Sequence, residues 1–177
     1  KGLYGKYGDW AYAGSSVYTP QYNTNKVSAA EAPKSWEDLL DPKWKGQITL
    51  TTDVKAWVTL ALEEGGWGIE KTEDFLRKLR QQQILWATSH TTGHALTITG
   101  EFKIFGESYV YLTLQAKDKG APIEWSRVRP VAVTGPSLVL LKKAPHPNAA
   151  KLFLEWLFSP PGLVVYDKVT YYGAASL

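Results

Sequence analysis

The chain of 177 residues contains no cysteine and only three histidines. Without cysteine, a disulfide framework, a thiolate metal site and a cysteine nucleophile are excluded. The longest apolar runs, at 138–141 and 163–166, fall far short of the roughly 20 residues that a membrane-spanning helix needs. The net charge of +3 is small and no run of Lys or Arg concentrates it, so nucleic acid is not an expected partner.

The composition is that of a folded domain with a substantial core. Apolar residues make up 44% of the chain and charged residues 21%. Eight Trp and ten Tyr are many for this length. They fit either a packed core or a ligand cleft lined with aromatic rings, and composition alone favours the core.

Short strands alternate with amphipathic helices along the chain. Strands are predicted at 46–51, 84–87, 102–105, 123–125, 131–133 and 137–142, and helices at 54–62, 72–82, 91–100, 109–119, 147–158 and 163–169. A shorter helix is expected after Ser35, which can cap it with Asp38 as its capping-box partner. The alternation predicts an α/β domain with a largely parallel central sheet.

Polar residues follow the strand predicted at 46–51. Thr51, Thr52 and Asp53 lead into a helix that carries Trp57 on its apolar face. In open α/β sheets, ligands bind at the carboxyl ends of strands, where free N–H groups of the next helix point outward. These residues are therefore candidate ligand contacts, although taken alone they favour plain helix capping by Thr52 or Asp53.

A second polar cluster follows the strand predicted at 102–105. It contains Glu107, Ser108, Tyr109 and Tyr111, directly after Gly106. Carboxylate and phenolate oxygens suit a hard cation, so the cluster is a candidate site. The competing interpretation is that a tyrosine packs in the core while Glu107 is solvated.

No arrangement of residues predicts an enzyme. A Ser–His–Asp order, a phosphate-binding glycine loop and a pair of catalytic acids are all missing. The alternative of a metal hydrolase would use His90 and His94, four residues apart, with Glu101 or Glu107. Exposed Trp side chains would suit another alternative, a carbohydrate-binding module.

Five segments resemble signatures of the family 1 extracellular solute-binding proteins of ferric-ion type. They are Tyr-Asn-Thr at 22–24, the 16 residues at 33–48, Gly-Glu at 100–101, Gly-Ala-Pro-Ile-Glu-Trp at 120–125, and the ten residues at 144–153. Their order and spacing match along nearly the whole chain. The resemblance implies a type II periplasmic-binding-protein lobe, with three layers around a mostly parallel sheet, from an ABC importer.

The resemblance also implies how the chain is organised. It corresponds to the C-terminal part of a two-lobed protein whose N-terminal lobe lies outside this sequence. Residues 1–25 would form a hinge crossing and a remnant of lobe one, 26–130 the solute-binding lobe two, and 131–177 the return hinge strand and C-terminal helices. The last segment would hold elements that normally belong to the other lobe. A contact surface for lobe one that includes Phe153 and Leu157 would then be exposed and could form a dimer.

By the same resemblance, the protein captures a small solute and delivers it to a membrane permease. It would work in the periplasm or, as an anchored lipoprotein, outside the cell. The solute would be Fe³⁺ with a synergistic anion, or a sugar phosphate, polyamine or other organic molecule. Ferric relatives carry adjacent tyrosines where this chain has Val110 and Tyr111, so only Tyr111 matches as a metal ligand. We expect no tightly bound solute in this part of the protein alone.

Overall fold

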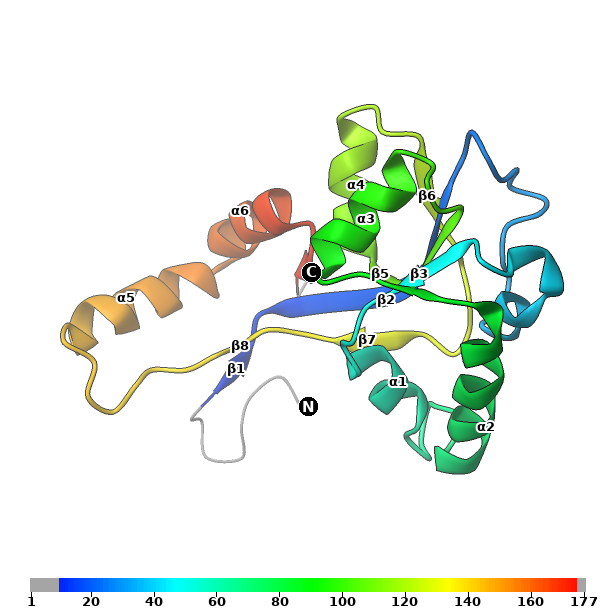
Figure 1. The fold of residues 1–177 in the computed structure, drawn as a ribbon. Helices are drawn as coiled ribbons and strands as arrows, with labels where there is room; N and C mark the ends of the chain where they lie inside the picture. The colour runs from blue at the N-terminus through cyan, green and yellow to red at the C-terminus, as the bar shows by residue number, and fades with distance from the viewer. Residues whose placement is uncertain (1–9, 175–177) are drawn as a thin grey trace. The chain divides into compact units, whose positions relative to one another are not determined.

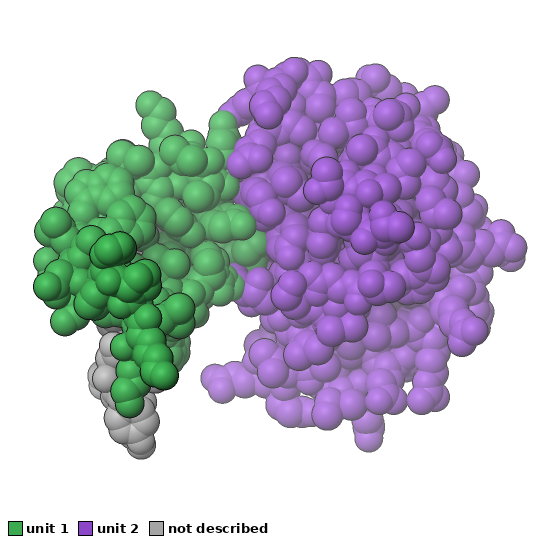
Figure 2. Space-filling view, turned by 60° about the vertical axis from the view of Figure 1, so that its left-hand side comes forward, with its two compact units in different colours: residues 1–16, 135–177 green, residues 17–134 purple. Residues whose placement is uncertain are grey.

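The computed structural model describes residues 10–174. They form two compact units, one of residues 17–134 and one that combines residues 10–16 with 135–174 (Figure 2). The larger unit begins within the segment 1–25, which the family resemblance assigns to a hinge crossing and a remnant of lobe one. Residues 17–23 belong to the larger unit because the strand that contains them pairs there with two others.

A five-stranded path forms the centre of the larger unit. Its order is β4 (Leu85–Trp86), β3 (Ile48–Leu50), β5 (Ile104–Tyr109), β2 (Gly14–Asn23) and β6 (Ile123–Trp125), while β7 (Ala132–Thr134) also pairs with β2. β4, β3 and β5 pair in parallel, and β2 runs antiparallel to β5 and β6. Four of the five strands therefore point the same way, and the predicted α/β class is confirmed.

Helices cover both faces of this sheet. They are α1 (Lys55–Leu60), α2 (Ile69–Leu79), α3 (His90–Ile98) and α4 (Val110–Asp118), with 3₁₀ turns η1 (Glu37–Leu40), η2 (Pro42–Trp44) and η3 (Arg80–Gln82). In Figure 1, α3 and α4 lie on one side of the sheet, and α1 and α2 lie on the other. The larger unit thus has the three layers that the family resemblance implied.

Local sequence explains several boundaries and corrects others. Ser35 and Asp38 exchange hydrogen bonds across the start of η1, as the capping pattern predicted. The second helix begins at Ile69 rather than at the predicted Thr72, because Gly68 adopts a φ of 79° just before it. Thr72 lies inside the helix, where its hydroxyl donates to the Gly68 carbonyl.

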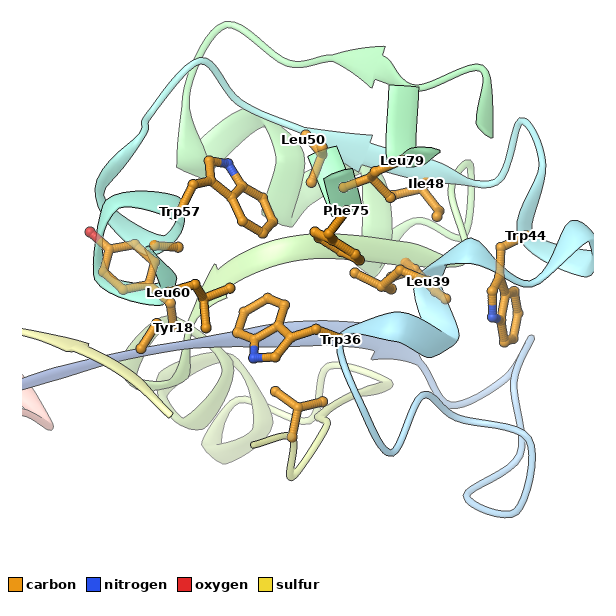
Figure 3. Close-up of a cluster of buried hydrophobic side chains, with 14 of the residues drawn as sticks. Tyr18, Trp36, Leu39, Trp44, Ile48, Leu50, Trp57, Leu60, Phe75 and Leu79 are labelled. Atoms are coloured by element: carbon orange, nitrogen blue, oxygen red, sulfur yellow. The ribbon is translucent and has the colours of Figure 1, made fainter. Parts of the chain in front are cut away.

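The core of the larger unit lies between the sheet and the α1–α2 layer. Trp36, Trp57 and Phe75 meet there, and the Trp36 and Trp57 rings pack edge to face with centroids 5.7 Å apart (Figure 3). The Trp36 indole N–H donates to the Pro130 carbonyl at 2.9 Å. Aromatic residues therefore fill this core, as composition indicated.

The smaller unit contains short strands and two helices. β1 (Ala11–Tyr12) pairs with β8 (Ser137–Leu138), and the start of β2 pairs with β9 (Gly173–Ala174). The helices are α5 (Pro147–Leu157) and α6 (Pro160–Thr170), each with proline in its first turn. None of the helices in residues 10–174 has the length and apolarity that crossing a bilayer requires.

The surface predicted to contact another lobe or a second copy is only partly exposed. Phe153 is exposed on α5, but Leu157 is buried within the smaller unit. Leu157 therefore cannot belong to such a contact surface. Leu152 and Trp156, which the prediction did not include, are exposed beside Phe153.

Candidate functional site

The two strand ends that the sequence singled out lie side by side. β3 and β5 are parallel neighbours in which Ile48 pairs with Ile104. The Thr51 backbone N–H and the Thr51 hydroxyl both donate to Oε1 of Glu107, each at 2.6 Å. The segments that follow Ile48 and Ile104 therefore share one edge of the sheet.

Two of the candidate side chains are enclosed rather than presented to solvent. β5 continues to Tyr109, so Glu107 and Ser108 lie within the strand and not in a loop after residue 105. Both are buried, and the Ser108 hydroxyl donates to the Gln21 side chain at 3.0 Å. Burial raises the pKa of Glu107 to about 8, against hydrogen bonds from Thr51 that lower it, so the carboxyl is protonated at neutral pH.

Four side chains at this edge form a continuous hydrogen-bonded group, which we call the edge network. The Tyr18 hydroxyl donates to the Tyr109 hydroxyl at 2.8 Å, and the Tyr109 hydroxyl donates to Oδ2 of Asp53 at 3.4 Å. Nε2 of His90 lies 3.2 Å from the same Asp53 oxygen. Tyr18, Asp53, His90 and Tyr109 thus join β2, the end of β3, α3 and β5.

The charges of the edge network follow from burial and from its hydrogen bonds. Burial opposes ionisation of Asp53, but hydrogen bonds from Lys55 and His90 outweigh it and lower the Asp53 pKa. Burial lowers the pKa of His90, although the neighbouring Asp53 acts to raise it. Burial and the hydrogen bond from Tyr18 together raise the pKa of Tyr109 well above its usual range. At neutral pH the network therefore carries the Asp53 carboxylate beside neutral His90 and neutral Tyr109.

The remaining candidates lie around this network. Thr52 is exposed, and Tyr111 is half-buried with its ring centroid 5.2 Å from that of Tyr109. Trp57 is buried and packs in the core, although one side of it lines a pocket. Sequence reasoning missed Tyr18 entirely and considered His90 only as a metal ligand, because their contacts with Tyr109 come from distant parts of the chain.

The arrangement assumed for a metal hydrolase does not form. His90 contacts Asp53, whereas Nδ1 of His94 lies 2.7 Å from the Gln21 side-chain oxygen in a different cluster. Within residues 10–174, no three His, Cys, Asp or Glu side chains come together as a metal-binding group. The two histidines share a helix but have separate partners.

In open α/β sheets, small molecules bind at the carboxyl ends of parallel strands, which is where the edge network lies. Residues 4–176 match the model of the bacterial extracellular solute-binding protein family, and the chain belongs to that family. An uncharacterized protein of Haemophilus influenzae is 32% identical over 143 residues, which cover 77% of this chain and 40% of that protein.

Solved structures of binding proteins share the fold. Iron-bound HitA from Pseudomonas aeruginosa matches 99% of this chain and 60% of its own with a TM-score of 0.78 and 22% identity. AfuA from Actinobacillus pleuropneumoniae, with exogenous fructose-6-phosphate bound, matches 92% of this chain and 53% of its own with a TM-score of 0.73 and 22% identity. The ferric binding protein from Campylobacter jejuni matches 97% of this chain and 59% of its own with a TM-score of 0.75 and 16% identity. The chain thus spans between two fifths and three fifths of the length of these relatives.

Proposed function

We infer that this chain is part of the solute-binding component of an ABC importer, in which the edge network forms one wall of the solute site. The protein captures its solute in the periplasm or at the outer cell surface and hands it to the membrane permease. The convergence of Tyr18, Asp53, His90 and Tyr109 at the ends of β3 and β5 carries this proposal. Membership of the extracellular solute-binding family supports it.

The solute is a small organic molecule with hydrogen-bonding groups. The edge network offers the Asp53 carboxylate, the His90 imidazole and the Tyr109 hydroxyl, which recognise ligand hydroxyl or amine groups. One fold relative was solved with fructose-6-phosphate, so the fold accommodates such a molecule. The anionic charge of Asp53 is already offset by Lys55, whose ammonium lies 2.8 Å from it. The wall is therefore not strongly charged.

Ferric iron is the second candidate, since Tyr109 and Tyr111 place two phenol rings side by side. A tyrosine binds ferric ion through its ionised phenolate oxygen, and the raised pKa of Tyr109 opposes loss of its proton. Titration with ferric citrate separates the two candidates. Organic-solute binding predicts no visible tyrosinate-to-iron absorption band, whereas a tight, coloured complex that disappears in Tyr111→Phe would establish iron.

Native mass spectrometry of the complete gene product identifies the solute. Calorimetry then measures how variants of the edge network change the affinity for that solute. Tyr109→Phe removes the hydroxyl at the centre of the edge network and should weaken solute binding about tenfold, the worth of one good hydrogen bond. Tyr22→Phe is the matched control, because Tyr22 lies toward the other end of β2, opposite Ile104. Equal affinities of both variants and the wild type would refute the proposed wall.

A further inference from the structure

An apolar pocket opens beside the edge network, on the α1–α2 side of β3. Its volume is about 350 Å³ and its lining is almost entirely apolar. The apolar walls include Leu50, Trp57, Leu76, Leu79, Ile84 and Trp86. Three of these, Leu50, Trp57 and Leu79, are seen in Figure 3 at the edge of the core, contributed by β3, α1 and α2.

The pocket has the properties of a small-molecule site and not of a packing defect. Its volume falls in the range of roughly 300–1,000 Å³ that is typical of ligand pockets. Water in it would find few polar partners, so expelling that water into bulk solvent favours binding of an apolar group. Trp86 stands at the end of β4 with 55% of its surface exposed, which leaves an indole accessible to a ligand.

The pocket and the edge network share the segment that follows β3. Thr51 and Asp53 line the pocket, and the same Asp53 bonds to His90 and Tyr109. One side of this short segment therefore meets hydrogen-bonding groups while the other meets apolar walls. A single molecule bound across Asp53 would contact both.

We propose that this pocket is an apolar subsite that holds a ring or branched aliphatic group of an organic solute, whose polar group binds the edge network. This assignment rests on the proposed function. If the assignment is correct, the solute is amphipathic. A bare metal ion or a wholly hydrophilic molecule would not fill such a site. Trp57 and Trp86 would contact the apolar group directly.

The test uses benzyl alcohol as an amphipathic probe and glycerol as a polar one. Nuclear magnetic resonance follows the indole N–H signals of Trp57 and Trp86 during each titration. Benzyl alcohol should shift both signals saturably, and glycerol should shift neither. Failure of benzyl alcohol to shift either indole would overturn the subsite.

Two pocket-filling variants and one matched control locate the binding. Ile84→Trp and the milder Leu76→Phe occupy the pocket and should weaken benzyl alcohol binding at least tenfold, with folding checked by thermal unfolding. Val58→Trp adds the same indole to an exposed position of α1 outside the pocket and should stay within twofold. If both variants fold and still bind benzyl alcohol as the wild type does, the probe binds elsewhere and the proposal is wrong.

The solute itself distinguishes this inference from the proposed function. Once mass spectrometry has identified the solute, Ile84→Trp should weaken its binding as it weakens that of benzyl alcohol. If the solute binds the wild type and Ile84→Trp equally well, the apolar subsite is refuted while the proposed transport function is unaffected. If benzyl alcohol binds in the pocket but Tyr109→Phe leaves solute binding unchanged, the apolar subsite is supported and the proposed wall is refuted.

Discussion

Glu107 accepts two hydrogen bonds from Thr51, one from its backbone N–H and one from its hydroxyl, both 2.6 Å long and both to the same oxygen. The other carboxyl oxygen is buried without a hydrogen-bond partner among the described residues. This contact fixes the segment that leaves β3 against β5. A buried, protonated carboxyl thus supports the segment that also carries Asp53.

The buried carboxyl should make stability fall as the pH rises. The folded chain keeps the Glu107 proton up to a pKa of about 8, whereas the unfolded chain loses it near the ordinary value of 4.5. Over this window the unfolded state binds fewer protons, so this group removes about 1.4 kcal/mol of unfolding free energy for each pH unit. Glu107→Gln cannot ionise, and urea unfolding between pH 5 and 8 should show a correspondingly weaker loss of stability. An unchanged slope would contradict the burial of this carboxyl.

Thr51→Val tests the hydrogen bond from the other side. The Thr51 hydroxyl stabilises the ionised form of Glu107 and lowers its pKa. Its removal should therefore raise the Glu107 pKa further, and carbon-13 NMR of the labelled carboxyl measures this directly. Thr52→Val is the matched control, because Thr52 is exposed and should leave the titration of Glu107 in place. A fall of the Glu107 pKa in Thr51→Val would be the contrary result.

Much of the sheet edge could be predicted because it depends on short-range patterns. The alternation of strands and helices implied parallel pairing, and parallel pairing implied that the ends of β3 and β5 meet. The hydrogen bond between Thr51 and Glu107 is a consequence of that neighbourhood.

The burial of Glu107 and Ser108 could not be predicted because their partners are far away in sequence. A Gly-Glu-Ser-Tyr segment is typical of a loop, yet β5 runs through it. Gln21, located 87 residues before Ser108, accepts hydrogen bonds from Ser108 and Thr113, and its side-chain oxygen also contacts His94. These tertiary hydrogen bonds make burial of polar side chains tolerable. The residues next to Glu107 and Ser108 in the sequence do not indicate these hydrogen bonds.

The same limit explains why Tyr18 and His90 were missed as members of the site. Tyr18 lies in the ten-residue β2, far along the chain from the predicted site. Its hydroxyl bonds to Tyr109, 91 residues later. Only the pairing of β2 with β5, which brings Tyr18 opposite Tyr109, reveals the contact.

Trp36 and Trp44 should respond differently to the same substitution. Both are buried, but the Trp36 indole N–H donates to Pro130, whereas that of Trp44 has no hydrogen-bond partner among the described residues. Trp36→Phe leaves the Pro130 carbonyl without its donor, while Trp44→Phe removes a donor that is already unsatisfied. Trp36→Phe should therefore cost about 1–3 kcal/mol more than Trp44→Phe in urea unfolding. Equal losses would show that the Pro130 hydrogen bond contributes nothing.

Gly106 and Leu50 should show strong coupling, because the space that a side chain would need at Gly106 is already filled. A Cβ at this position would lie 2.5 Å from Cδ2 of Leu50, whose side chain is buried. The side chain closest to this position is therefore a leucine from β3. Gly106→Ala alone should destabilise the chain by about 1–3 kcal/mol through overpacking.

Leu50→Val removes the clashing methyl group and should itself cost about 1 kcal/mol through lost burial. In the double variant the alanine methyl occupies the space that the leucine vacates. Its loss of unfolding free energy should therefore be smaller than the sum of the two single losses, since contacting residues are not additive. Urea unfolding of the four proteins measures this coupling. Strict additivity would mean that β3 and β5 do not pack as closely here as the 2.5 Å approach requires.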